Sequence, residues 1–199
     1  MITGHVFVVA SGFGKRVIPT GAPVQFELGL AGALNVTIDD QSAIVTPDQH
    51  PSDASSRIAD VVEGPSWAGW WLQTTLYRVP LPAGWVAHAS GSIEPSAFDL
   101  LGPGESLIFI QTPRHVPTID QMVAPGQTIL ERSFIPRAEL ITLGYFDQEH
   151  DYRQHHAIVA LGSLTAVVTL QGIAQCLPLV SATHRFLIDS IQQGDQWDE

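Results

Sequence analysis

The chain has 199 residues, enough for one large or two small domains, and with 45% hydrophobic and 15% charged residues it is too apolar for extensive disorder. Its 20 acidic residues outnumber 9 Lys and Arg, which gives a formal net charge of -11. Because nucleic acids and anionic membranes are bound mainly through basic side chains, this charge argues against both as partners and favours a basic protein. The oligomeric state does not follow from the composition.

Cysteine usage and hydropathy limit the compartment and the metal chemistry. Cys176 is the single cysteine, so an internal disulfide and a thiolate metal cage are excluded. The first residues lack a basic leader before their short apolar run, and no apolar run reaches the ~20 residues of a membrane helix. We therefore expect a cytoplasmic protein without a cofactor.

The N-terminal third has the pattern of a small antiparallel meander. Apolar residues alternate or cluster over Ile2–Val9, Val24–Leu30 and Leu34–Ile38, with glycine and aspartate between them. The Pro-, Ser- and Asp-rich segment Pro47–Ser56 is the most loop-like in the chain. We predict a β-rich subdomain over residues 1–66 and a second domain over residues 67–199.

Three tryptophans follow within five residues. On a strand, Trp67 and Trp71 lie on one face and Trp70 on the other. Two interpretations are open: buried packing, as aromatic clusters usually show, or an exposed surface for a partner.

The second domain is predicted to be a sheet with helices. Tyr77–Leu81 alternates, Ser106–Thr112 is rich in apolar residues, and Thr118–Ala124 has the pattern of a short helix. The strands predicted over Glu139–Phe146 and Ala157–Leu161 form a long hairpin whose polar link, residues 147–156, projects into solvent.

The C-terminal segments have the clearest periodicity. Leu164–Leu170 is almost entirely apolar, which predicts a central strand. We predict a helix after this strand, because apolar residues and one histidine recur at steps of three and four residues: Leu177, Val180, His184, Leu187 and Ile191.

The order of elements over residues 76–193 resembles the PsbP-like fold. The resemblance is carried by Tyr77–Pro82, Gly84–Trp85, Phe98–Pro103, Leu107–Thr112 and Leu179–Ile191. That family includes a photosystem oxygen-evolving subunit, Ran-binding release factors and bacterial proteins of contact-dependent toxin secretion. It implies an α/β/α sandwich, an antiparallel β-sheet covered by helices, which serves mainly as a binding scaffold. It assigns no catalytic residue to this chain.

Searches for catalytic motifs favour structural interpretations. Ser11–Lys15 contains two glycines and a lysine, but the glycine spacing is too short for a phosphate-binding loop, and a β-turn is the simpler interpretation. No GxSxG motif occurs, and Cys176 falls where the last helix begins. We predict no catalytic residue.

Polar and aromatic residues concentrate around the predicted hairpin link. We predict that the partner-binding residues are Asp147, Glu149, Asp151, Tyr152 and His155, together with Trp67 and Trp70. The alternative is a metal-dependent enzyme that uses the carboxylates and imidazoles of residues 147–156, although no helical ligand spacing orients them. We predict no metal site.

The sequence therefore suggests a non-enzymatic protein-binding module. Its most concrete form is an immunity protein that neutralises a secreted bacterial toxin, for example one of type VI secretion. A secretion chaperone for a toxin effector is the alternative among binding proteins.

Overall fold

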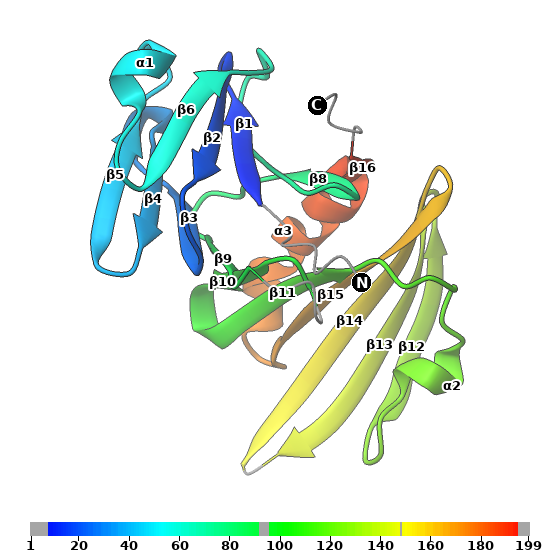
Figure 1. The fold of residues 1–199 in the computed structure, drawn as a ribbon. Coiled ribbons are helices and arrows are strands. Elements are labelled where there is room, and N and C mark those ends of the chain that lie inside the picture. The colour runs from blue at the N-terminus through cyan, green and yellow to red at the C-terminus, as the bar shows by residue number, and fades with distance from the viewer. Residues whose placement is uncertain (1–7, 92–95, 148, 195–199) are drawn as a thin grey trace. The chain divides into compact units, whose positions relative to one another are not determined.

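The structure, a computed structural model, describes residues 8–91, 96–147 and 149–194. It divides into two compact units, the first formed by residues 1–100 and 192–199 and the second by residues 101–191 (Figure 1). The boundary predicted between residues 66 and 67 lies between β6 (Ala59–Glu63) and β7 (Trp71–Gln73), inside the first unit. None of the helices in these described ranges is long and apolar enough to cross a bilayer.

One sheet of the first unit has the strand order β16-β8-β7-β1-β2-β6, and its neighbouring strands are antiparallel. The strands not yet defined are β1 (Val9–Gly12), β2 (Lys15–Pro19), β8 (Tyr77–Pro80) and β16 (Gln192–Gln193). Leu72, Tyr77 and Val79 alternate with more exposed residues and fill the core on one side.

A second set of strands in the first unit has the order β9-β3-β4-β5. The strands are β3 (Val24–Leu28), β4 (Leu34–Ile38), β5 (Gln41–Val45) and β9 (Val86–Ala89), and short helices η1 (Leu30–Gly32) and α1 (Pro51–Ala54) follow β3 and β5. The meander predicted from Val24 to Ile38 is confirmed. Residues 2–7 of the first predicted strand lie outside the described residues.

The second unit contains an antiparallel sheet of order β12-β13-β14-β15-β11. Its strands are β11 (Ser106–Gln111), β12 (Thr128–Ile135), β13 (Ala138–Asp147), β14 (His150–Leu161) and β15 (Leu164–Ile173). β10 (Asp99–Gly102) contains the boundary between the units, and η2 (Pro103–Glu105) and α2 (Ile119–Met122) lie on either side of β11. Because β15 has a hydrogen-bonded neighbour on each side and Ala166–Leu170 is buried, the predicted central strand is confirmed.

α3 (Leu177–Ser190) packs against the sheet of the second unit. Its Pro178 lies in the first turn, where no helical N–H is lost. Leu177, Val180, His184, Leu187 and Ile188 are buried along one stripe, as the periodicity predicted. Arg137 donates hydrogen bonds to the carbonyls of Asp189 and Ile191, and so satisfies backbone oxygens that the helix end leaves free.

The predicted α/β/α sandwich is wrong. The protein is mostly antiparallel β-sheet, with 51% strand and 15% helix. Within the described ranges α1 and α2 are four residues long, so only α3 is long enough to cover a sheet. The segment Thr118–Ala124 lies between Pro117 and Pro125, which restrict it to one helical turn, and the following residues form β12 instead of a layer of helix.

The stability of the second unit should depend on the buried stripe of α3. Replacing Leu187, which is fully buried, with Ala should lower the free energy of unfolding by ~2–5 kcal/mol through lost burial and a residual cavity. Leu179→Ala in the same helix is the control, because 78% of Leu179 is exposed, and it should cost less than ~0.5 kcal/mol. Reversible chemical denaturation measures both, and equal losses would show that α3 is packed through another face.

Candidate functional site

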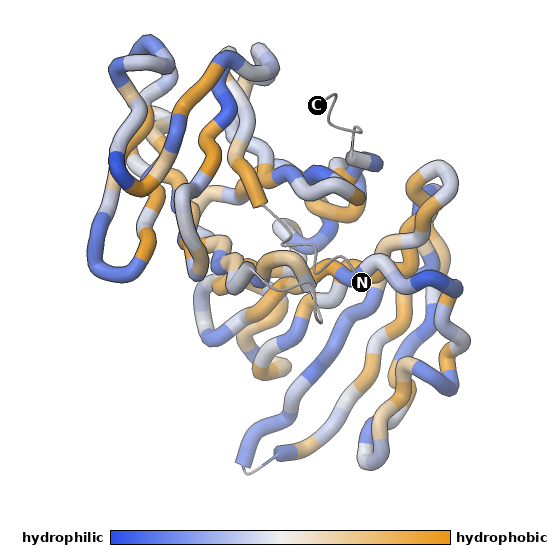
Figure 2. Tube along the Cα trace, in the orientation of Figure 1, coloured by the Kyte–Doolittle hydropathy of each residue, from blue (hydrophilic) through white to orange (hydrophobic). Residues whose placement is uncertain are grey.

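The hairpin β13–β14 carries most of the residues that the sequence analysis selected. Ala138 lies opposite Val159 at one end of its ladder and Asp147 lies opposite His150 at the other. Because this ladder includes Asp147 and residues 150–156, the predicted ten-residue polar link is mostly strand. Figure 2 shows that the half of β14 nearest this turn is hydrophilic. A hairpin is confirmed, but its polar residues have defined strand positions.

We call residues 145–147 and 149–152 the hairpin end. On one face, the rings of Tyr145 and Tyr152 stack at a centroid distance of 5.3 Å and an angle of 11°, and His150 meets Tyr152 edge-on at 6.3 Å. Burial raises the pKa of Tyr145, and the neighbouring Tyr152 and Asp147 raise it further. The directly opposed positions of Tyr145 and Tyr152 on the two strands produce this pair.

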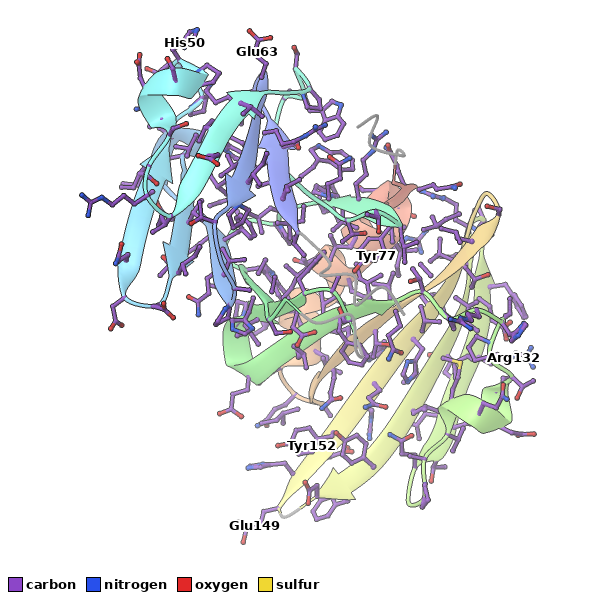
Figure 3. The ribbon with its side chains drawn as sticks, viewed as in Figure 1. His50, Glu63, Tyr77, Arg132, Glu149 and Tyr152 are labelled. Carbon is purple, nitrogen blue, oxygen red and sulfur yellow. The ribbon has the colours of Figure 1, made fainter. Side chains whose placement is uncertain are left out.

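Acidic and apolar groups are exposed beside the tyrosines. Asp147 and Glu149 are exposed, and Figure 3 shows Glu149 directed away from the sheet at the turn. Asp151 forms an ion pair with Arg153, so part of its charge is neutralised. Phe146, which the sequence analysis did not select, is 73% exposed. The hairpin end thus combines exposed negative charge with aromatic surface.

The two predicted tryptophans have different environments. Trp70 is 2% exposed, donates from Nε1 to the Gly32 carbonyl at 2.8 Å and meets Phe13 edge-on, so it packs inside the first unit. Trp67 is half-buried, with its ring 5.6 Å from Trp71 and 4.7 Å from the Arg78 guanidinium carbon. Trp67 and Trp70 precede β7 and lie outside a strand, so the predicted strand faces do not apply to them. Buried packing is the right interpretation for Trp70.

His155 lies elsewhere on the hairpin, in a pocket between the sheet and α3. The strand registers align Glu131 with Thr142 and Thr142 with His155, which forms a row across β12, β13 and β14. α3 contributes Ser181, His184 and Arg185 to the opposite wall. The pocket has a volume of ≈ 430 Å³, and Leu140 and Ile188 provide apolar lining. This is the size range of small-molecule sites.

Hydrogen bonds fix the ring orientations of His155 and His184, two of the three histidines that line the pocket. His184 Nε2 lies 3.1 Å from the Val168 carbonyl, which only accepts, so Nε2 carries the proton and Nδ1 of the neutral ring is an acceptor. His155 Nδ1 lies 3.2 Å from Thr142 Oγ1. The ring centroids of His155 and His184 are 6.5 Å apart. Burial lowers the pKa of His155 and lowers that of His184 to about 4. Burial therefore favours the neutral form of both rings.

His156 is adjacent in sequence but belongs to the opposite face of β14. Its Nδ1 lies 2.9 Å from Thr169 Oγ1 on β15. Its buried Nε2 has no hydrogen-bond partner among the described residues. Burial lowers its pKa to about 4, so the ring stays neutral and its threonine partner fixes the orientation.

The other chemical candidates have structural environments. Phe13 and Gly14, both with positive φ, form the two-residue turn between β1 and β2, and Lys15 is 3% exposed with Nζ donating to the Pro47 carbonyl at 2.6 Å. The β-turn interpretation is therefore right. In the described ranges, no group of three or more His, Cys, Asp or Glu residues could hold a metal ion.

Comparisons with known proteins leave the family open. No protein-family model matches the chain, and no curated protein sequence matches it significantly. The resemblance to the PsbP-like family stays a hypothesis.

Sequence reasoning missed four residues that shape these surfaces: Glu131, Thr142, Phe146 and His184. Glu131, Thr142 and Phe146 sit inside predicted strands or segments with no distinguishing spacing. His184 was assigned to the apolar stripe of the last helix. Only the register of three strands and the position of α3 bring Glu131, Thr142 and His184 together, and neither follows from local patterns.

The buried His184 should make stability depend on pH. Its pKa is about 4 in the folded protein and about 6.5 when unfolded, so the unfolded chain takes up a proton first as the pH falls. The contribution of the neutral His184 to the free energy of unfolding is complete above pH 6.5. It is lost as the pH falls from 6.5 to about 4, and the loss is on the order of 3 kcal/mol. A His184→Gln variant, which keeps an N–H donor, should show a shallower loss in denaturation curves over this range.

His115→Gln provides the control, because this exposed histidine lies in the loop before α2. It should leave the pH dependence as in the parent protein. Parallel curves for the parent protein and His184→Gln would contradict a neutral, buried imidazole at position 184.

Proposed function

We propose that the protein is a non-enzymatic binding module that contacts a basic protein partner through the hairpin end. The observation that carries this proposal is the combination, on one hairpin, of exposed Asp147 and Glu149 with exposed Phe146 and the Tyr145–Tyr152 stack. Aromatic side chains supply most of the energy in small protein interfaces, and surrounding charges steer the encounter. The net charge of -11 selects a basic partner.

The stacked tyrosines suit this role because they are preorganised. Tyr145 and Tyr152 hold each other on adjacent, directly opposed strand positions, so little side-chain entropy remains to be lost on binding. Their hydroxyl groups can still exchange hydrogen bonds with a partner at the edge of the contact. Phe146 points to the other face of the same strand and extends the apolar surface around the turn.

The particular role that we propose is neutralisation of a secreted bacterial toxin in the cytoplasm. With the α/β/α scaffold excluded, the acidic charge and the hairpin end are the features that support it. A secretion chaperone would need an apolar groove for an effector helix. The ≈ 430 Å³ pocket is lined by Glu131, Arg185 and three histidines, so it does not supply such a groove.

Charge reversal at the turn should slow association. Asp147→Lys with Glu149→Lys should reduce the association rate and its dependence on salt, because exposed charges act mainly on the encounter. The partner to use is the protein encoded by the adjacent gene, with kinetics followed by surface plasmon resonance. Asp60→Lys with Glu63→Lys, exposed residues of the first unit, changes the net charge equally and should have a smaller effect. Equal slowing by both pairs would mean that only total charge matters.

Aromatic truncation should shorten the lifetime of the complex instead. Tyr152→Ala and Phe146→Ala should each raise the dissociation rate. For a residue at the centre of the contact, the corresponding loss of binding free energy is on the order of 2 kcal/mol. Phe134→Ala is a matched control, because Phe134 is 70% exposed but lies on β12. Unchanged dissociation in the two hairpin variants, with folding intact by circular dichroism, would reject this surface.

A further inference from the structure

The pocket between α3 and the sheet has an uneven balance of charge. Arg185 donates from Nε to Asp189 Oδ2 at 2.9 Å, so its positive charge is matched within the helix. Arg132 and Arg153 are paired in the same way with Glu139 and Asp151. No ion pair holds Glu131 in the described part of the chain, although its charge acts on His155. The pocket therefore has, in the exposed Glu131, a negative charge that no ion pair compensates among the described residues.

The pocket that contains Glu131 also contains a hydrogen-bond acceptor of His184. His184, which lines the pocket, uses its one N–H on the Val168 carbonyl, and this leaves Nδ1 as an acceptor. His155 is held by Thr142 through Nδ1, so Nε2 is its remaining ring nitrogen. The Glu131 carboxylate and the Nδ1 acceptor of His184 together complement a group that donates several hydrogen bonds and carries positive charge.

Protonated amines and guanidines have this chemistry. An ammonium group has three N–H donors and a guanidinium has five, and neither accepts. Leu140 and Ile188 offer apolar surface for an attached alkyl chain. A small anion would instead meet the Glu131 carboxylate and an arginine that is already paired. Metal coordination is not favoured, because these side chains do not form a ligand group within the described ranges.

We propose that this pocket binds a small organic cation, with its amine or guanidine head group between Glu131, His155 and His184 and its alkyl chain against Leu140 and Ile188. The ligand is bound reversibly and undergoes no reaction. The site lies away from the hairpin end on the same hairpin, and it does not depend on the proposed protein partner. It adds a small-molecule binding activity to the second unit.

The test uses butylguanidinium as the probe and butylurea as its neutral, similarly shaped control. Both are titrated into the full-length protein at pH 7.5, and the ring Cε1–H signals of His155 and His184 are followed by NMR. We expect saturable shifts of both signals with butylguanidinium and no saturable shift with butylurea. Equal responses to the two compounds, or none to butylguanidinium, would overturn the proposal.

Two carboxyl variants test the position of the head group. Glu131→Gln should weaken butylguanidinium binding at least about tenfold, because a hydrogen bond to a charged group is replaced by a neutral one. Glu139→Gln should leave the affinity within about twofold, since this carboxyl faces Arg132 on the other side of the sheet. Affinities for Glu131→Gln equal to the parent protein would contradict the assignment, and circular dichroism verifies that both variants are folded.

Discussion

The register of β13, β14 and β15 is the constraint on which both candidate surfaces depend. Each strand is ten or twelve residues long, and the ladders run without a shift from Tyr152 to Leu161. Because successive side chains point to opposite faces, a slip by one residue would exchange the two faces of the hairpin. Burial of Val168 and Leu170 together with the α3 stripe opposes such a slip.

This register separates two kinds of chemistry on one hairpin. The row of Glu131, Thr142 and His155 faces the pocket with α3, which contributes His184 to the lining. Tyr145 and Tyr152 form a row on the opposite face, near the turn. The hairpin therefore carries part of a pocket at one position and an exposed aromatic and acidic end at the other. Neither surface requires a loop to become ordered.

Local periodicity predicted the elements that are packed most simply. The apolar run of β15 and the three- and four-residue steps of α3 come from burial, which leaves a direct trace in the sequence. The same holds for the alternation of β3 and β4. Lys15 was less predictable, because a buried lysine is rare and its carbonyl partner, Pro47, is 32 residues away.

The fold class and the pocket could not be predicted because they depend on pairing between distant segments. Residues 150–156 are polar, which suggested a loop, yet each pairs with β13 and so satisfies its backbone within a strand. The order of elements alone suggested helices over a sheet, whereas strand ladders account for most of the described chain. Glu131, Thr142 and His184 meet only after three strands and a helix have assembled.

The register can be tested directly by NMR on the isotopically labelled full-length protein. Nuclear Overhauser effects should connect the Thr142 methyl group with the ring of His155, since the two side chains lie opposite each other and share a hydrogen bond. The rings of Tyr145 and Tyr152 should show the same kind of contact. Contacts from Thr142 to the ring of His156 instead would mean that the hairpin is shifted by one residue, and would contradict both the pocket and the hairpin end.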